Sequence, residues 1–268
     1  MPISSFLYIK PRDWGGRIAR YLGSWWAMLH LGAVALVMAM SPSIWHRGNR
    51  LATSRYIYAS TWAVLPWFTV LTALISLVII RIVLVTAQSY GLSGFALEMM
   101  VRVLVLELLP LSAAMFAALR ASMAFDANAM GLAASGVATG DALESTLRRV
   151  RRDLVPQVIA NAFSVLSLAM VSSVIVLVLA YLNVYGVSPW GLSDYTRTVG
   201  RVFDPTVTLG FVFKTVLFGL AVAVIPSAAI LDMLRHRRRH RSNVQPGALR
   251  LLFVLLLIEA SSLAVKYI

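Results

Sequence analysis

Apolar stretches alternate with short polar segments along this chain, and five of the apolar stretches are unusually long. Each exceeds the roughly 20 residues that an α-helix needs to cross a hydrocarbon core about 30 Å thick. We therefore predict an all-α, polytopic membrane protein with five transmembrane helices. The predicted spans are Trp62–Thr86, Phe95–Phe125, Leu154–Tyr185, Thr206–Leu234 and Ala248–Ile268.

A sixth apolar segment, Trp25–Met40, is only about 16 residues long, which is short for a membrane crossing. Arginines precede this segment, and Trp25 and Trp26 suit the headgroup level of a bilayer. We predict an interfacial helix here, or one that dips into the membrane and returns. The chain then divides into an N-terminal segment, residues 1–56, and a five-span domain, residues 57–268.

The composition agrees with a membrane protein, because 59% of the residues are hydrophobic and 13% are charged. The net charge of +13 comes from basic residues that sit beside the predicted spans and do not gather on one surface. This distribution favours anionic lipid headgroups over nucleic acid as the partner of the charge. The chain has no cysteine, which excludes disulfides and thiolate metal sites.

Basic residues also alternate between the loops, which predicts the orientation. The leading segment and the second and fourth loops are rich in arginine, whereas Arg197 and Arg201 of the third loop are offset by Asp194 and Asp204. The N-terminus is therefore expected inside and the C-terminus outside.

Met1–Asp13 lacks the apolar core of a signal peptide, so the spans are expected to direct insertion. A basic run in the fourth loop is predicted to anchor on anionic lipid: Arg235, Arg237, Arg238, Arg239 and Arg241.

Ionisable side chains inside a span cost roughly 2.5–3.5 kcal/mol each on insertion scales and usually mark function. Glu107 lies near the middle of the second span, and Pro110 follows it one turn later. We expect the helix to bend there and to form the wall of a substrate cavity beside a buried carboxylate. The alternative is a protonated Glu107 that is only hydrogen-bonded to a neighbouring helix. Glu259 lies midway along the last span.

Three basic side chains fall in the outer half of the predicted spans: Arg81, Arg102 and Lys214. Together with Glu107 and Pro110 they are predicted to bind a substrate with an anionic headgroup, for which phosphate is the obvious candidate. The alternative is that Arg81 and Lys214 each snorkel to the outer surface. Arg102 also has Glu98 one turn earlier, at the spacing of a local ion pair.

The second cytoplasmic loop, residues 131–153, contains a short amphipathic segment, Asp141–Arg152. Its acidic residues come early and its arginines late, as the helix dipole prefers, and Thr139 precedes it as a candidate N-cap. We predict a cytoplasmic helix that grips an ATPase partner, with an interfacial helix that touches only lipid as the alternative. The residues assigned to this contact are Asp141, Leu143, Glu144, Leu147 and Arg148.

The sequence contains no phosphate-binding loop, dinucleotide fingerprint, zinc-protease motif or serine-hydrolase motif. If ATP drives this protein, another chain is expected to bind it, and we assign no cofactor, metal ligand or catalytic residue here. Two alternatives to a transporter stay open. One is an intramembrane lipid-modifying enzyme with Glu107 or Glu259 as general base, and the other is a non-transporting membrane anchor of a lipid-handling complex.

Several of these residues resemble the MlaE family, the permease subunits of ABC transporters that work with periplasmic MCE-domain proteins. The run Leu106–Pro110, followed by Arg120, is similar to the family's central signature. The run Ala138–Glu144 is similar to its cytoplasmic motif, and Pro156–Ala160 to its entry into the third span. Glu259 corresponds to the family's acidic residue in the last span.

The resemblance implies a homodimeric permease in a bacterial inner membrane, bound to cytoplasmic ATPase subunits and to a periplasmic MCE-domain partner, that moves phospholipid between membrane and partner. The chain departs from the family pattern where Leu106 replaces an arginine, Leu109 a glycine and Ala138 a glutamate, and where the run Arg235–Arg241 replaces a glycine-rich fourth loop. Arg81 falls near a position where relatives carry glutamine. We expect Arg81 or Arg102 to stand in for the lost arginine.

Overall fold

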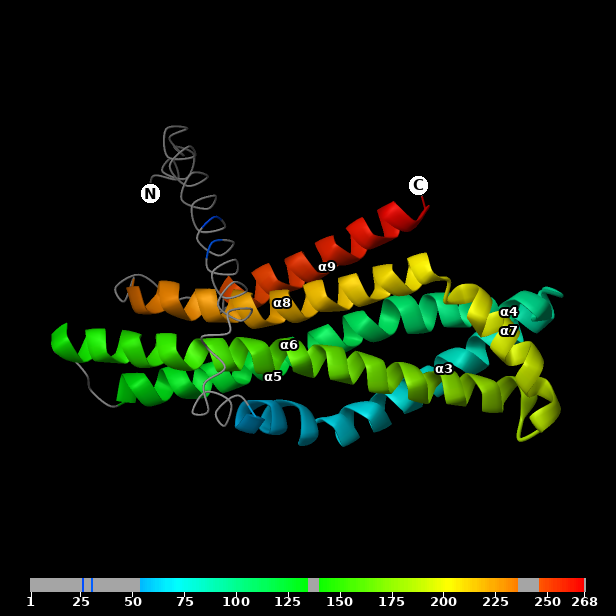
Figure 1. Cartoon of the computed structure of the whole chain (residues 1–268), viewed down its shortest axis with the longest axis horizontal. Coiled ribbons are helices and arrows are strands. Elements are labelled where there is room, and N and C mark those ends of the chain that lie inside the picture. Colours follow the sequence, from blue (N-terminus) through cyan, green and yellow to red (C-terminus); the bar gives the residue numbers. More distant parts are fainter. Residues whose placement is uncertain (1–25, 27–29, 31–53, 135–139, 236–245, 268) are drawn as a thin grey trace, which may run out of the picture.

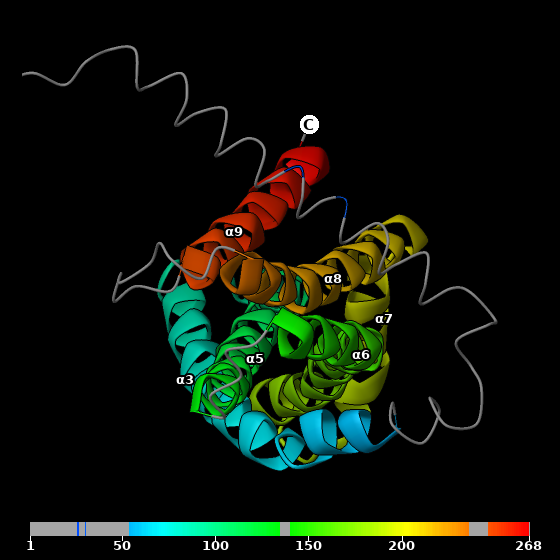
Figure 2. The ribbon, with the colours of Figure 1, turned by 90° about the vertical axis from the view of Figure 1, so that its left-hand side faces the viewer.

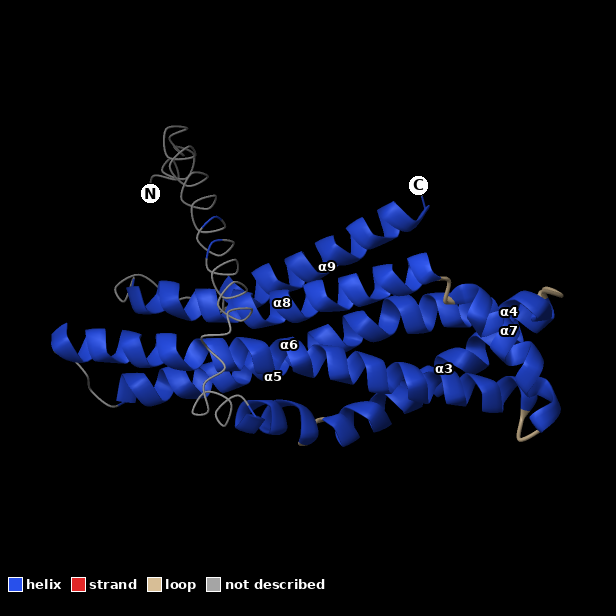
Figure 3. Ribbon diagram, viewed as in Figure 1, coloured by secondary structure: helices blue, strands red, loops and turns tan. Residues whose placement is uncertain are grey.

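The computed structural model describes residues 54–134, 140–235 and 246–267, together with Trp26 and His30. Most of the predicted interfacial segment, the candidate cap Thr139 and the arginines from Arg237 to Arg241 lie outside these residues. Throughout the described part the chain is helical, and no strand occurs in it (Figure 3). This is the expected result for a chain in lipid, where every backbone polar group needs a partner within its own segment.

The helices run in the order predicted, with short π and 3₁₀ segments between some of them. The elements are η2 (Tyr58–Trp62), α3 (Leu65–Ser89), α4 (Ser93–Met100), η3 (Val101–Leu108), α5 (Leu109–Ala134), α6 (Gly140–Tyr185), η4 (Pro189–Gly191), α7 (Leu192–Val202), α8 (Pro205–Arg235) and α9 (Pro246–Tyr267).

Five helical segments are long and apolar enough to cross a membrane, which confirms the five predicted spans. They are Leu65–Ser89, Gly94–Ala121, Ile159–Tyr185, Pro205–Pro226 and Gly247–Val265. Each overlaps one predicted stretch, and most of their ends differ by a few residues.

The spans form a bundle in which α5 and α6 lie at the centre (Figures 1 and 2). Seen end-on, α3 covers one side of this pair, while α8 and then α9 cover the other. Helix α9 is the most peripheral, because only 11% of its apolar window is buried, against 56% for α8. The outer faces of α3 and α9 are therefore left to lipid or to another chain.

Helices α6 and α8 approach each other closely at a glycine. A Cβ added at Gly219 of α8 would lie 3.0 Å from the carbonyl oxygen of Ala162 in α6. Small residues at such a contact allow two helix backbones to pack directly in a membrane, where dispersion replaces the hydrophobic effect as the driving force. The two helices are thereby held as one packed unit.

The predicted bend at Pro110 takes the form of a π-helix. Residues Val101–Leu108 wind with the wider π spacing, and the N–H of Leu109 donates to the carbonyl of Leu104, five residues earlier. Proline has no N–H to donate and its ring would clash with the carbonyl of Leu106 in a regular α-helix. One wide turn before the proline relieves this conflict, and such π segments occur often at functional sites. Glu107 lies within that turn.

The predicted cytoplasmic helix is not a separate element, and this expectation is corrected. Asp141–Arg152 forms the first turns of α6, a single helix of 46 residues that continues through Pro156 into the third span. No glycine interrupts residues 141–185, and one proline is not enough to end the helix. Residues 140–153, which precede the predicted third span, account for about 21 Å of this helix at about 1.5 Å per residue. The last part of α5 runs beside them, and we call these two helix ends the projecting hairpin (Figure 1).

The opposite end of the bundle carries a short helix, α7, in a segment that the sequence analysis treated only as a charged loop. It has Asp194 in its first turn and Arg201 in its last, as the helix dipole prefers. Its buried Tyr195 donates a hydrogen bond of 2.7 Å to the carbonyl of Leu177 in α6, which ties α7 to the bundle. Burial raises the pKa of Tyr195 to about 12, so this donor keeps its proton at neutral pH.

Labelling of introduced cysteines tests this arrangement, because the chain has none of its own. Tyr90 and Ser193 lie in the described part at the end of the bundle near α4 and α7, whereas Arg149 lies in the projecting hairpin. We expect a membrane-impermeant maleimide to label Tyr90→Cys and Ser193→Cys from outside, and Arg149→Cys only after the membrane is opened. Labelling of all three from one side would contradict the five-span topology.

The packing of α6 on α8 gives a second prediction. Gly219→Val places a side chain against the backbone of Ala162 and should lower the free energy of unfolding by about 1–3 kcal/mol. Gly210→Val is the matched control in the same helix, because a Cβ at Gly210 meets no atom within 4 Å. Thermal unfolding of the purified variants, followed by helical circular dichroism, measures the difference. Equal midpoints for the two variants would exclude the close contact.

Candidate functional site

Three charged side chains from three helical segments meet inside the bundle. They are Glu107 of η3, Lys214 of α8 and Glu259 of α9, and we call them the charged triad. The Lys214 ammonium donates a hydrogen bond to Oε2 of Glu107, and it lies 2.8 Å from Oε2 of Glu259. The triad therefore links segments that lie far apart in the sequence.

The triad is almost completely buried. The side chains of Lys214, Glu107 and Glu259 are 3%, 15% and 13% exposed. Each lies within an apolar span and several residues from its ends. At this depth an unpaired charge is costly, and removing one partner of a buried pair leaves the other uncompensated. Mutual pairing is what makes these three side chains compatible with the membrane interior.

Helical periodicity explains why Lys214 points inward. Buried residues of α8 recur at the spacing of one helix face: Phe211, Lys214, Thr215, Phe218 and Val222. Lys214 lies on this face, and its ammonium is 5.8 Å from the centroid of the Phe218 ring, within the range of a cation–π contact. The hydroxyl of Thr215 is satisfied by the carbonyl of Phe211, at 2.7 Å. The lysine is thus the one charged position in this buried stripe, whose other members are three apolar residues and Thr215.

Both carboxylates contact the lysine, but with different geometry. The Lys214–Glu107 contact is a hydrogen bond as well as an ion pair, whereas the Lys214–Glu259 ion pair, at 2.8 Å, is less well aligned as a hydrogen bond. Oε2 of Glu259 is buried without a well-aligned hydrogen-bond donor among the described residues. The carboxyl group of Glu259 also interacts with that of Glu107. Two acidic groups therefore share one ammonium.

The other predicted substrate residues lie apart from the triad. Arg102 forms the expected local ion pair with Glu98, at 3.0 Å, which confirms that prediction. Arg81 is exposed on α3, and Pro110 is buried directly after the π-helix. Among the described ion pairs, Lys214 contacts Glu107 and Glu259, and neither Arg81 nor Arg102 takes part in these contacts. Lys214 does not snorkel either, because its side chain is buried against carboxylates.

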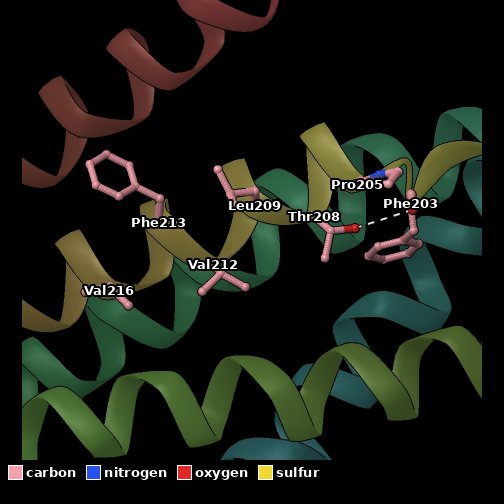
Figure 4. A pocket seen from close by; sticks show the side chains of 7 residues that line it. All are labelled: Phe203, Pro205, Thr208, Leu209, Val212, Phe213 and Val216. Atoms are coloured by element: carbon pink, nitrogen blue, oxygen red, sulfur yellow. Dashed lines mark hydrogen bonds between the residues drawn. The ribbon is translucent and has the colours of Figure 1, made fainter.

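An apolar pocket of about 770 Å³ opens at the N-terminal end of α8 (Figure 4). Its lining comes from the first turns of α8 and the turn that precedes the helix: Phe203, Pro205, Thr208, Leu209, Val212, Phe213 and Val216. Thr208 is the single polar side chain in this lining, and its hydroxyl is directed at the carbonyl of Phe203. The pocket and Lys214 belong to the same helix, so an apolar surface and a buried charge lie within a few turns of each other.

The predicted contacts at the other end of the bundle are placed only by their backbone. Asp141, Leu143, Glu144, Leu147 and Arg148 belong to the projecting part of α6, and Arg235 is the last residue of α8. Among the residues that the structure describes, no three His, Cys, Asp or Glu side chains are grouped as metal ligands would be.

Sequence reasoning noted Glu259 but did not include it in the site. A signal was present, because the predicted middle parts of the spans contain two acids and one lysine, and charges at one depth are expected to pair. The buried stripe of α8 was also readable, since residues 211, 214, 215, 218 and 222 follow helical spacing. Lys214 was instead assigned to the same site as Arg81 and Arg102, because all three lie in the outer half of the predicted spans.

Comparison with known proteins gives one match. A family model described as Permease MlaE matches residues 53–262, which include four complete spans, most of the fifth and the whole charged triad. No similar curated protein and no similar solved structure was found.

The pairing within the triad predicts that its members differ in their importance for stability. Lys214→Met should lower the free energy of unfolding by about 3–5 kcal/mol, because it leaves two carboxylates buried without a counter-ion. Glu259→Gln should cost much less, because Glu107 and Lys214 still form a neutral pair. Thermal unfolding in detergent measures both, with Arg81→Met as the exposed control. A Lys214→Met variant as stable as the control would contradict the pairing.

Proposed function

Because the chain belongs to the MlaE permease family, whose members are membrane subunits of ABC transporters, we propose that it carries phospholipid through the bilayer interior. In this proposal the phospholipid moves between a bacterial inner membrane and a periplasmic MCE-domain partner. A separate cytoplasmic subunit hydrolyses ATP, and two copies of this chain form the permease.

The observation that carries the proposal is the buried charged triad, with an apolar pocket on the exposed face of the same helix, α8. A phospholipid needs polar groups for its headgroup and apolar walls for its acyl chains. The Lys214 ammonium can bind a phosphate, and the carboxylates of Glu107 and Glu259 can accept hydrogen bonds from a headgroup amine. The pocket at the start of α8 suits an acyl chain, since all but one of its lining side chains are apolar.

Arg81 and Arg102 take a different part in this proposal. Arg102 is half-exposed and paired with Glu98, and Arg81 is exposed. Exposed arginines can meet a phosphate as it enters from the bilayer, before it reaches the buried lysine. Pro110 acts through the backbone, because the π-helix that precedes it carries Glu107.

The projecting hairpin of α5 and α6 supports the proposed contact with an ATPase subunit. The sequence has no phosphate-binding loop for ATP, so the energy would have to arrive through another chain. Helix α6 runs without a break from the proposed contact residues, Asp141 to Arg148, into the third span. It then packs against α8 at Ala162 and Gly219, about one and a half turns from Lys214. A movement of the hairpin would therefore reach the helix that carries the lysine.

The remaining assignments follow from the free surfaces. The exposed apolar face of α9 suits a second copy of this chain, and the end of the bundle formed by α4 and α7 would face the MCE-domain partner. The inner membrane, with the N-terminus inside, follows from the arrangement of arginines in the loops.

Transfer of a fluorescent phospholipid from reconstituted vesicles tests the proposal. Glu107→Gln should reduce ATP-dependent transfer at least about tenfold, because an amide cannot replace the carboxyl group in headgroup binding although it keeps the shape of the side chain. Glu98→Gln is the matched control, since Glu98 is an acidic residue of the same span outside the triad. Unchanged transfer by an assembled Glu107→Gln complex would refute the role of the triad in lipid binding.

A further inference from the structure

The charges of the triad do not balance. With all three groups ionised, Glu107 and Glu259 carry two negative charges against one positive charge on Lys214. The side chains are 3–15% exposed, so water can screen little of the excess charge. One proton on the carboxyl pair would bring the net charge of the triad to zero.

The geometry offers a place for that proton. Oε2 of Glu259 is buried without a well-aligned donor among the described residues, although it lies 2.8 Å from the Lys214 ammonium. The carboxyl group of Glu259 also interacts with that of Glu107. Two ionised carboxylates repel each other, whereas a protonated carboxyl group can donate a hydrogen bond to an ionised one. A proton between the two carboxyl groups would therefore replace their repulsion with a hydrogen bond.

Other charged groups in the described spans lie too far away, or are already paired, to supply this compensation. Arg120 lies about 20 Å from Glu107 along the second span, and Arg250 about 14 Å from Glu259 along α9. Arg102 pairs with Glu98, Arg81 is exposed on α3, and the third span, residues 159–185, contains no charged residue.

We propose that Glu107 and Glu259 share one proton in the lipid-free protein, and that an anionic lipid phosphate bound to Lys214 drives the uptake of a second. This inference rests on the proposed function. The phosphate and the carboxylates compete for one ammonium, so a phosphate monoanion displaces negative charge from it. Protonation of the displaced carboxylate restores neutrality, with two protonated acids, one ammonium and one phosphate anion. Release of the lipid returns the proton.

The coupling has a selectivity consequence. An anionic phospholipid such as phosphatidylglycerol adds one net charge to the triad and requires the second proton. A zwitterionic phospholipid such as phosphatidylcholine brings its own cation and adds none. By linkage, the affinity for phosphatidylglycerol should rise about tenfold for each unit of decrease in pH over the range in which uptake is complete, and that for phosphatidylcholine should not.

The shared proton is tested first, by infrared spectroscopy of the lipid-free protein. The wild type should show the carbonyl stretch of a protonated carboxyl group at neutral pH. Glu259→Gln and Glu107→Gln should both lose this band, because the remaining carboxylate then forms a neutral ion pair with Lys214. Glu98→Gln is the control and should keep it. The proposal is overturned if the wild type lacks the band. It is also overturned if Glu107→Gln and Glu259→Gln both keep the band.

Proton uptake is tested in weakly buffered detergent with a pH-sensitive dye. Addition of short-chain phosphatidylglycerol should take up about one proton per bound lipid, and phosphatidylcholine about none. The double variant E107Q/E259Q lacks both proton acceptors, so any phosphatidylglycerol that it binds should be bound without proton uptake and without dependence on pH. Binding of phosphatidylglycerol by the wild type without proton uptake overturns the inference and leaves the proposed function standing. If neither lipid binds, both the inference and the proposed function are overturned.

Discussion

Lys214 carries a positive charge to the middle of a membrane-spanning helix, where two carboxylates from other segments meet it. A lone charge at that depth has a high free-energy cost. Removing the lysine would leave the carboxylates unpaired, and removing both carboxylates would leave the lysine unpaired. The packing of α8 against η3 and α9 is therefore constrained electrostatically as well as by shape. In a membrane, where apolar side chains gain little from leaving lipid, such a polar contact has unusual weight in fixing which helices meet.

The same contact lies close to the parts of the fold that could move it. Glu107 is carried by the π-helix before Pro110, a segment whose turns are wider than those of an α-helix. Lys214 is carried by α8, which packs tightly on α6 through Gly219. Helix α6 itself runs beside α5 and α8 and passes their ends at the hairpin (Figure 1). The fold thus connects a buried charge cluster to an exposed hairpin through one continuous helix and one close helix–helix contact.

The features that could be predicted from the sequence are those determined by the lipid environment or by local residue spacing. The five spans follow from apolar length, because backbone in lipid has no alternative to the helix. The Glu98–Arg102 pair follows from its spacing of four residues. The partners of Lys214 did not follow, because Glu107 and Glu259 are separated from it by dozens of residues and only the packing of three segments brings them together. The continuity of α6 was missed because a change from polar to apolar residues suggests a boundary, although helix propensity continues across it.

Lys214 is needed in this fold because it neutralises buried carboxylates. The sharpest test of that role is thermal unfolding of Lys214→Met alone and combined with Glu107→Gln and Glu259→Gln. If the lysine acts through its charge, the triple variant should recover most of the stability that the single variant loses, because no unpaired charge is then left in the site. A triple variant no more stable than Lys214→Met would contradict the account.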